Sequence, residues 1–410
     1  MRYSCWLSVI SDIVDHVSIK QRAYPESGAQ TNALLMHFSH ARYVYNVGLE
    51  QRKLNDKTQR ARGVRVNAVT QQRELTEARR EFDWLREGST VVQQGALRDL
   101  DTAFKNFFAG HAGFPKYRRR GVHNTFVVRD LSVRRYNRKW AAILVPKAGW
   151  LKFRLTRAWS DVESGTSARV SLKHGQWFVS ITTPPKPKRE GGRGAVGLDR
   201  GVAVSVMSSE GEMFTAPSLT DGERKRWVAL ERQLSRCERR SARRVQTRDR
   251  LGALRRRLNN RRNDWVEKST THLANTYALA GVEDLNISGM VRKPAPKPDE
   301  QGGYLPNGAA AKSGLTKAIQ ASQWGRFAQR LSDKMEVVKV PTAYTSQCCH
   351  ECGHIDPENR KSQAEFRCVR CGHTANADVN AAKNIRELAV CGGTLREWAK
   401  ARADANLQRV

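Results

Sequence analysis

The sequence predicts an α+β protein with several domains, and three observations support this prediction. Hydrophobic residues follow helical spacing in residues 29–110 and then form short strand-like runs in residues 124–182. A stretch rich in Pro, Gly and Lys, residues 184–194, is typical of a boundary between domains. Two closely spaced pairs of cysteines between residues 349 and 371 indicate a small metal-binding element. The length of 410 residues agrees with two or three domains.

The net charge of the chain indicates which class of molecule it binds. The sequence contains 72 Lys and Arg against 40 Asp and Glu, a formal net charge of +32. Such an excess is expected where the partner is a polyanion, first nucleic acid and second an anionic membrane surface. The basic residues run through the whole chain and not along one amphipathic helix, which favours nucleic acid. No apolar run approaches the roughly 18 residues that span a bilayer, and the apolar patch of residues 6–10 is a poor match to a signal peptide.

The first half is expected to contain one strand, a helical block and a set of short strands. Residues 17–23 alternate between apolar and polar side chains, which predicts a strand ahead of Pro25. In residues 29–110, apolar side chains recur at helical spacing around Leu34 and again around Leu100. The short runs in residues 124–182 predict a small antiparallel barrel or sandwich.

The second half is expected to alternate between strands and helices. Residues 195–198 predict a strand that ends at Asp199, and a hairpin follows over residues 202–215. Residues 223–262 carry 16 basic and 4 acidic residues on a helical pattern, too uneven for an ordinary solvated face. The remaining expected elements are a strand over 280–282 that ends at Glu283, an irregular segment over 291–314, a helix over 315–335, a strand over 337–340 and a helix from about Ala377.

Four cysteines have the spacing C-x2-C-x15-C-x2-C: Cys349, Cys352, Cys368 and Cys371. Two residues between the thiolates let both sulfurs bind one ion, and the glycine after each pair permits the turn. The pattern predicts a structural Zn²⁺ with four sulfur ligands, and a reducing cytoplasm as the location. Cys348 could compete with Cys349, but only Cys349 gives the two-residue gap.

Three carboxylates stand in contexts that are individually weak and jointly informative. Asp199 and Glu283 each end a predicted strand, and Asp378 begins a predicted helix directly after the second cysteine pair. Each alone is more often a turn or helix-end acid. Together they offer the hard oxygen ligands with which two Mg²⁺ ions, about 3.5–4 Å apart, support phosphodiester hydrolysis.

At these residues the sequence resembles the TnpB family, insertion-sequence proteins related to compact type V CRISPR effectors. The resemblance rests on four motifs: GLDRG at 197–201, VEDLNISGM at 282–290, TSQCCHECGH at 345–354 and FRCVRCGHTANADVNAAKNI at 366–385. It implies an RNA-guided DNA endonuclease with an RNase H-like RuvC nuclease domain. The implied partners are a guide RNA and target double-stranded DNA beside a short flanking motif. A prokaryotic, nucleoid-associated location follows from this.

The resemblance also implies site roles and a domain order. Asp199, Glu283 and Asp378 become the catalytic acids, with Asp199 bridging two Mg²⁺ ions and the other two holding one each. Arg200 departs from the small or apolar residue expected there, and a strand should direct it away from Asp199. The implied domains are a wedge β-barrel at 1–28 and 121–185, a helical recognition lobe at 29–120, a RuvC-like nuclease at 186–344 and 374–410, and a zinc-ribbon target-nucleic-acid-binding element at 345–373.

Two groups of basic residues are candidates for contacts with phosphates. The first follows the helical block and includes an aromatic ring that could stack on a base. The second lies in the helices of residues 223–262. The candidates are Lys116, Tyr117, Arg118, Arg119 and Arg120 in the first group, and Arg243, Arg244, Arg255 and Arg256 in the second.

Several alternatives stay open from the sequence. A guide-dependent DNA-binding regulator on the same fold would lack one or more acids, and all three are present. A zinc-ribbon nucleic-acid-binding protein would use the acids only structurally and need no guide. A transposase proper would need strand-transfer activity, for which no feature is seen. A transposon-borne nuclease and a compact type V CRISPR effector are not separated by the sequence, and neither is the oligomeric state.

Overall fold

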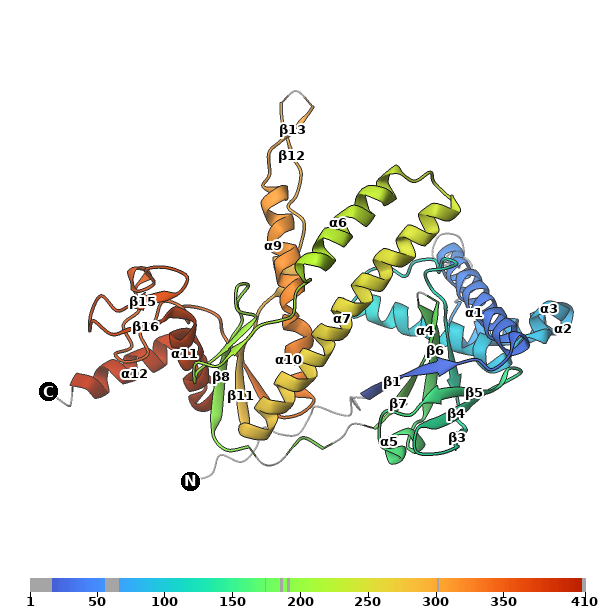
Figure 1. Ribbon diagram of the computed structural model, residues 1–410, viewed down its shortest axis with the longest axis horizontal. Helices are drawn as coiled ribbons and strands as arrows, with labels where there is room; N and C mark the ends of the chain where they lie inside the picture. Colours follow the sequence, from blue (N-terminus) through green and yellow to red (C-terminus); the bar gives the residue numbers. More distant parts are fainter. Residues whose placement is uncertain are drawn as a thin grey trace. The chain divides into compact units, whose positions relative to one another are not determined.

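The computed structural model describes residues 17–55, 66–173, 175–184, 187–189, 192–300 and 302–407, with side chains up to residue 402. The chain forms two compact units, Met1–Lys186 and Pro187–Val410 (Figure 1). The division falls inside the stretch of residues 184–194 that is rich in Pro and Gly. The apolar patch of residues 6–10 lies outside the described residues.

The first unit is built on a seven-stranded antiparallel sheet in the order β2-β6-β7-β1-β5-β4-β3. Its strands are β1 Val17–Tyr24, β2 Thr125–Arg129, β3 Val133–Arg135, β4 Trp140–Val145, β5 Gly149–Arg154, β6 Ser167–Lys173 and β7 Gln176–Thr183. Phe126 of β2 and Ile143 of β4, near opposite edges of the sheet, belong to one buried core. The small antiparallel β-structure expected from the short runs is present, with β2 and β3 as its edges among the described strands.

The helices of the first unit follow the predicted helical block. They are α1 Gly28–Leu54, α2 Ala68–Glu81, α3 Asp83–Glu87, α4 Thr90–Phe108 and, between strands, α5 Trp159–Glu163. Ser27 and Asn67 cap α1 and α2, because their side-chain oxygens accept from backbone N–H groups of the first turn. Leu34 and Phe38 of α1 and Leu100 of α4 are buried in the same core as the sheet.

The second unit is built on a mixed five-stranded sheet in the order β10-β9-β8-β11-β14. Its strands are β8 Ala195–Asp199, β9 Val206–Ser208, β10 Met213–Phe214, β11 Leu279–Glu283 and β14 Glu336–Val340. β8, β9 and β10 pair antiparallel, whereas β11 pairs parallel with both β8 and β14. Parallel strands need long crossover connections, and those of this unit contain helices.

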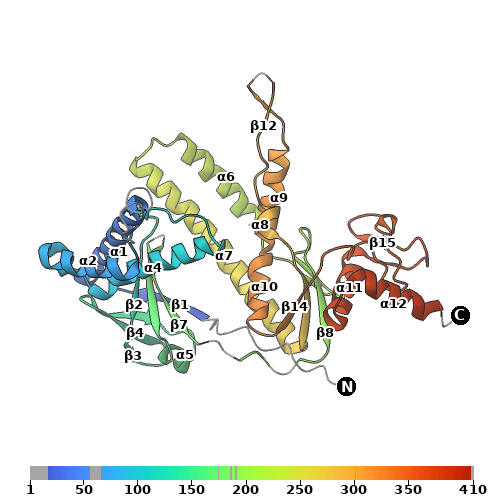
Figure 2. The same cartoon turned by 180° about the vertical axis from the view of Figure 1, so that it is seen from behind.

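Two of these helices form a long basic hairpin between β10 and β11, seen side by side in both views (Figure 1 and Figure 2). They are α6 Asp221–Arg236 and α7 Ala242–Thr276. The second crossover contains α8 Ile287–Met290, a small hairpin of β12 Lys297–Pro298 and β13 Tyr304–Leu305, then α9 Ala309–Ser322 and α10 Trp324–Ser332. The single helix expected over 315–335 is thus two helices, since Gln323 adopts a left-handed conformation with φ 59°.

The last part of the chain carries the cysteines. It contains a 3-10 turn at Pro357–Asn359, the hairpin of β15 Glu365–Arg367 and β16 Thr374–Asn376, and the helices α11 Ala377–Cys391 and α12 Leu395–Leu407. Asn376 caps α11, accepting from the N–H groups of Asp378 and Val379 at 3.0 and 3.2 Å. In the described part of the chain, no helix is long and apolar enough to cross a membrane.

Candidate metal centres and nucleic-acid interface

Asp199 and Glu283 end neighbouring parallel strands of the second unit. The register pairs Leu198 of β8 with Val282 of β11, so the next residue on each strand is one of these acids. Because the carboxyl ends of parallel strands meet at one edge of the sheet, the two side chains share that edge.

Asp378 reaches the same place because α11 lies directly against β8 and β11. A methyl group on Gly197 would overlap the carbonyl oxygen of Ala382 in α11, and one on Gly281 would lie 2.8 Å from the carbonyl oxygen of Ile385. Both glycines are therefore required by close packing of helix and strand. That packing brings the first turn of α11, with Asp378, to the edge that holds the other two acids.

The three carboxylates lie in one electrostatic environment. Burial, followed by the charges of Glu283 and Asp378, raises the pKa of Asp199 from 3.8 to about 7. Burial also raises the pKa of Glu283, whereas the hydroxyl of Thr345 and the charge of Arg200 lower it. Carboxylates that lie close together and are buried or half-buried fit a divalent cation, whose positive charge would offset their repulsion.

The four cysteines form a compact group of potential metal ligands. In the described part of the chain, one group of three or more His, Cys, Asp or Glu is close enough to hold a metal ion: the four cysteines, whose Sγ atoms all lie within 4.8 Å of one another. Among the described residues, Asp199, Glu283 and Asp378 do not form a second group of this kind.

The side chain of Arg200 lies beside the acids, although strand alternation predicted that it would point away from Asp199. Its side chain is buried, and its Nη2 donates to the backbone carbonyl oxygen of Glu283. The charges of Glu283 and Asp199 act on it, although burial lowers its pKa overall. The strand ends at Asp199, so the residue after it is no longer bound by the alternation of the sheet.

Arg360 is a residue of this site that the sequence did not reveal. It follows the 3-10 turn of the cysteine-rich element, and its Nη2 lies 3.3 Å from Oδ1 of Asp378. Its charge also lowers the pKa of Asp199. No motif marks this arginine, because its partner lies 18 residues further along the chain and only the fold of the cysteine-rich element brings the two together.

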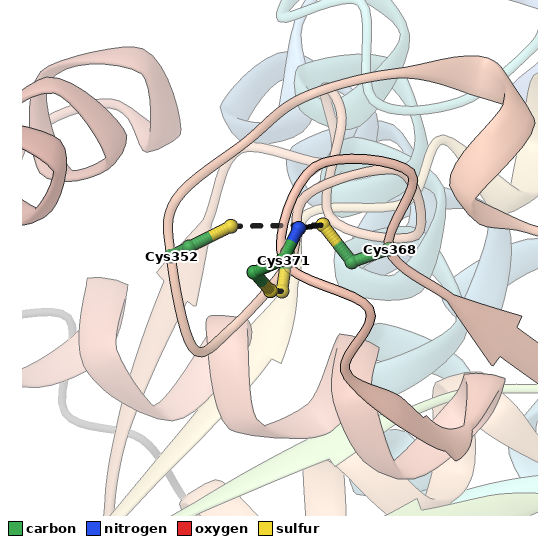
Figure 3. A group of neighbouring side chains, drawn as sticks. Cys352, Cys368 and Cys371 are labelled. Atoms are coloured by element: carbon green, nitrogen blue, oxygen red, sulfur yellow. Dashed lines mark hydrogen bonds between the residues drawn. The ribbon is translucent and has the colours of Figure 1, made fainter.

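The structure brings the four predicted cysteines together. The Sγ atoms of Cys349 and Cys371 are 3.7 Å apart, and those of Cys352 and Cys368 are 3.6 Å apart. Figure 3 shows Cys352, Cys368 and Cys371 converging from the two turns. Four sulfurs about 2.3 Å from one zinc in a tetrahedron would lie about 3.8 Å from one another. The donor set and its spacing therefore fit Zn²⁺.

Cys348 stands outside this cluster. Its Sγ lies 3.7 Å from the carbonyl oxygens of Cys349 and Gly353, and burial raises its pKa to about 12. A neutral, buried thiol of this kind packs as a small apolar residue. His350, a potential metal ligand next to Cys349, stacks its ring on that of Trp398 in α12, with ring centroids 5.8 Å apart.

The basic candidates of the first unit divide into exposed and internally paired residues. Lys116, Arg119 and Arg120 are exposed. Arg118 is paired with Asp99 at 2.8 Å, and its guanidinium lies 3.9 Å from the ring centre of Tyr45. Tyr117 is exposed but donates to Glu50 and lies under Lys53, with 3.9 Å from Nζ to the ring centre. Arg118 is therefore occupied within the unit.

The basic candidates of α7 divide in the same way. Arg243 and Arg255 are exposed, and Arg255 lies 5.4 Å from the ring centre of Trp227 in α6. Arg244 donates from Nη1 to the carbonyl oxygens of Leu234 and Cys237 at 2.8 and 3.1 Å. It therefore caps the end of α6. Arg256 is half-buried, and its Nη1 has no hydrogen-bond partner among the described residues.

Comparison with known proteins agrees with this arrangement. Two proteins that carry the name "Putative RNA-guided DNA endonuclease" are similar to this chain. InsQ of Escherichia coli (strain K12) is 34% identical over 316 residues, which is 74% of this chain and 76% of InsQ. The chain belongs to the TnpB family. The second relative, from Streptomyces pristinaespiralis, is 30% identical over 381 residues, 90% of this chain and 88% of that protein.

Two family models match the parts of this TnpB-family chain that carry the candidate site. The one described as "Probable transposase" matches residues 178–293, which include Asp199 and Glu283. The one described as "Cas12f1-like, TNB domain" matches residues 324–385, which include the four cysteines and Asp378. The resemblance inferred from the motifs is thereby confirmed.

The fold of the chain is similar to that of a solved Cas12f1 structure. The structure named "Cryo-EM structure of the Cas12f1-sgRNA-target DNA complex" aligns with a TM-score of 0.51 at 15% identity, covering 87% of this chain and 82% of that one. At this identity the likeness concerns the fold. The predicted fold class, with its RuvC-like nuclease and cysteine-rich insert, is confirmed.

Proposed function

We propose that this chain is an RNA-guided, Mg²⁺-dependent endonuclease that hydrolyses double-stranded DNA beside a short flanking motif. Membership of the TnpB family and the names of its relatives support the guided activity. The observation that carries the chemistry is the meeting of Asp199, Glu283 and Asp378 from β8, β11 and α11, with the pKa of Asp199 raised to about 7.

Asp199, Glu283 and Asp378 would hold the catalytic Mg²⁺ ions. When bound, the ions supply the water-activating and charge-stabilising chemistry of phosphodiester hydrolysis. The protein contributes the fixed places of the oxygens, since two come from neighbouring strands and one from a helix packed on them. Bound cations would favour the ionised carboxylate of Asp199, whose pKa is raised to about 7 by burial and the neighbouring acids.

Arg200 and Arg360 would moderate the negative charge of the site. Arg200 fixes the end of β11 by donating to the carbonyl oxygen of Glu283, and Arg360 pairs with Asp378 at 3.3 Å. Two guanidinium groups partly offset three carboxylates before any cation is bound. The acid edge can therefore stay folded in the absence of Mg²⁺.

A structural zinc would be held by Cys349, Cys352, Cys368 and Cys371, with no coordination position left for substrate. The cysteine-rich element at residues 345–373 would contact target nucleic acid. The first unit would supply a wedge domain, residues 1–28 and 121–185, and a helical recognition lobe, residues 29–120. Residues 186–344 and 374–410 would form the RuvC-like nuclease domain.

Nucleic acids would follow the exposed basic residues of both units. Lys116, Arg119 and Arg120 in the first unit and Arg243 and Arg255 on α7 have side chains free for phosphates. Arg118 and Arg244 would act indirectly, since each is engaged within the protein. A chain with a net charge of +32 that binds RNA and DNA is proposed to be nucleoid-associated in the cytoplasm.

The first test is to express the chain with its native flanking DNA and to sequence the RNA that co-purifies. A discrete RNA with one variable end is expected. The same RNA, reprogrammed to a new target, should direct cleavage with Mg²⁺. Asp199→Ala should lower the cleavage rate by at least about a thousandfold, because it removes a principal electrostatic group of the site. RNA binding should be unchanged.

The matched control is Asp284→Ala, which removes the exposed acid next to Glu283 and should cut like the unaltered protein. Random RNA in place of a discrete species would favour the zinc-ribbon nucleic-acid-binding protein without a guide. Guided binding without cleavage would favour the DNA-binding regulator on the same fold.

A further inference from the structure

Glu283 receives its only side-chain hydrogen bond, within the described part of the chain, from Thr345. The Oγ1 of Thr345 lies 2.9 Å from Oε1 of Glu283, and both residues are buried, 3% and 8% exposed. The same hydroxyl lies 3.2 Å from the carbonyl oxygen of Thr342. A hydroxyl has one proton, and the carboxylate is both the nearer and the more strongly accepting of the two groups.

The backbone at Thr345 is fixed from the helix that bears Asp378. The Nδ2 of Asn384, a fully buried residue of α11, donates to the carbonyl oxygen of Thr345 at 2.9 Å and to that of Cys348 at 2.8 Å. Since buried amide hydrogen bonds are costly to break, Asn384 holds Thr345 in register with α11.

One turn earlier, α11 also holds the first cysteine turn. The Nδ2 of Asn380 donates to the carbonyl oxygen of Cys348 at 2.7 Å, and its Oδ1 accepts from the backbone N–H of His350 at 3.0 Å. Cys349, a predicted zinc ligand, lies between these two residues. A continuous set of hydrogen bonds therefore runs from the cysteine turn through α11 to the hydroxyl that contacts Glu283.

We infer that Thr345 is a positioning residue, which holds the Glu283 carboxylate for metal binding and ties the acid site to the first cysteine turn. This inference rests on the proposed function. The hydroxyl engages Oε1 and leaves Oε2 without a hydrogen bond from the described residues. A bond of this kind fixes the orientation of a metal-binding carboxylate, and its loss typically weakens metal binding about 10- to 100-fold.

A purely structural role of Thr345 would predict different results for its variants. If the hydroxyl of Thr345 only stabilised the backbone through its bond to the carbonyl oxygen of Thr342, metal binding by Glu283 would not depend on it. The two roles are separated by a serine, which keeps the hydroxyl, and by a valine, which keeps the shape. They are also separated by a background in which Glu283 no longer carries a charge.

The test measures Mn²⁺ binding to the full, zinc-loaded chain, from the electron paramagnetic resonance signal of free Mn²⁺. We expect Thr345→Val to weaken binding about 10-fold and Thr345→Ser to bind like the unaltered protein. In a Glu283→Gln background, Thr345→Val should weaken binding no further. The matched control is Thr270→Val, which removes another fully buried hydroxyl of the same unit, bonded to the carbonyl oxygen of Val266 at 2.7 Å. It should lower Tm and leave Mn²⁺ binding unchanged.

Unaltered Mn²⁺ binding in Thr345→Val would overturn the inference while the proposed function stands. Equal losses in the valine and serine variants, or a further loss in the Glu283→Gln background, would also overturn it, because the effect would then not pass through the hydroxyl and carboxylate. Equal Mn²⁺ binding by the unaltered chain and Asp199→Asn would instead refute the metal site of the proposed function. Should the valine variant fail to fold, Thr345→Ala supplies the comparison, because it also removes the hydroxyl: it should weaken Mn²⁺ binding in the otherwise unaltered chain and weaken it no further in the Glu283→Gln background.

Discussion

Arg360 of the cysteine-rich element and Asp378 in the first turn of α11 form an ion pair, with 3.3 Å between Nη2 and Oδ1. Their side chains are 30% and 17% exposed, so solvent screens the pair only partly. The guanidinium thus occupies one oxygen of an acid proposed to bind Mg²⁺. Arg360 and a bound metal ion would therefore compete for the negatively charged carboxylate of Asp378.

The first prediction concerns this competition. Arg360→Gln should bind Mn²⁺ about three- to tenfold more tightly, because a nearby positive charge worth roughly a kcal/mol has been removed. The measurement is Mn²⁺ titration of the full chain. Arg370→Gln, an exposed arginine of the same element, makes the same change in net charge and should bind as before. Equal tightening in both variants would mean that only the net charge matters.

The second prediction concerns pH. Burial and the neighbouring acids raise the pKa of Asp199 from 3.8 to about 7, so between these values the folded state holds a proton that the unfolded state has lost. The free energy of unfolding of the Mg²⁺-free protein should therefore fall as pH rises through this window, by on the order of a few kcal/mol. Tm measured from about pH 5 to about pH 8 tests this.

Asp199→Asn should reduce the decrease in the free energy of unfolding with rising pH, because the asparagine amide does not titrate. Some slope should remain, since the pKa of Glu283 is also raised. Saturating Mg²⁺ should likewise reduce the fall in the unaltered protein, as the ion replaces the proton. A slope that is equal in Asp199→Asn and the unaltered chain would contradict the assignment of the shift to Asp199.

The third prediction concerns zinc. Cys368→Ser should open the cysteine-rich element to proteolysis, because zinc binding supplies much of the folding free energy of such small elements. It should also weaken Mn²⁺ binding, since Arg360 and Thr345 lie in that element and contact Asp378 and Glu283. Cys391→Ser, an exposed cysteine at the end of α11, serves as the control. Limited proteolysis and zinc content are the measurements, and intact, zinc-loaded Cys368→Ser protein would refute the assignment.

The sequence predicted residues whose role is set locally and missed those whose role is set by distant partners. The acids and cysteines were recognisable because each stands at a strand end, a helix start or a turn with fixed spacing. Arg360 carries no such mark, since Asp378 becomes its partner only when the cysteine-rich element folds.

The same reason explains the basic candidates. Arg118 and Arg244 look like their neighbours in the sequence, yet one pairs with Asp99 and the other caps α6. Charge density predicts a nucleic-acid surface as a whole. It cannot distinguish an arginine facing solvent from one whose donors are used inside the protein, because that depends on chain segments that lie elsewhere in the sequence.

The fourth prediction concerns the packing that brings Asp378 to the site. Gly197→Ala should displace α11, because the added methyl group overlaps the carbonyl oxygen of Ala382. Overpacking of this kind costs about 1–3 kcal/mol, so Tm should fall while the chain stays folded. Cleavage should fall far more than stability, since the helix shift separates Asp378 from Asp199. Gly222→Ala in α6, where a methyl group meets open space, should leave Tm unchanged or slightly raised. A Gly197→Ala protein that loses stability but cuts at the normal rate would show that the acid cluster tolerates movement of α11.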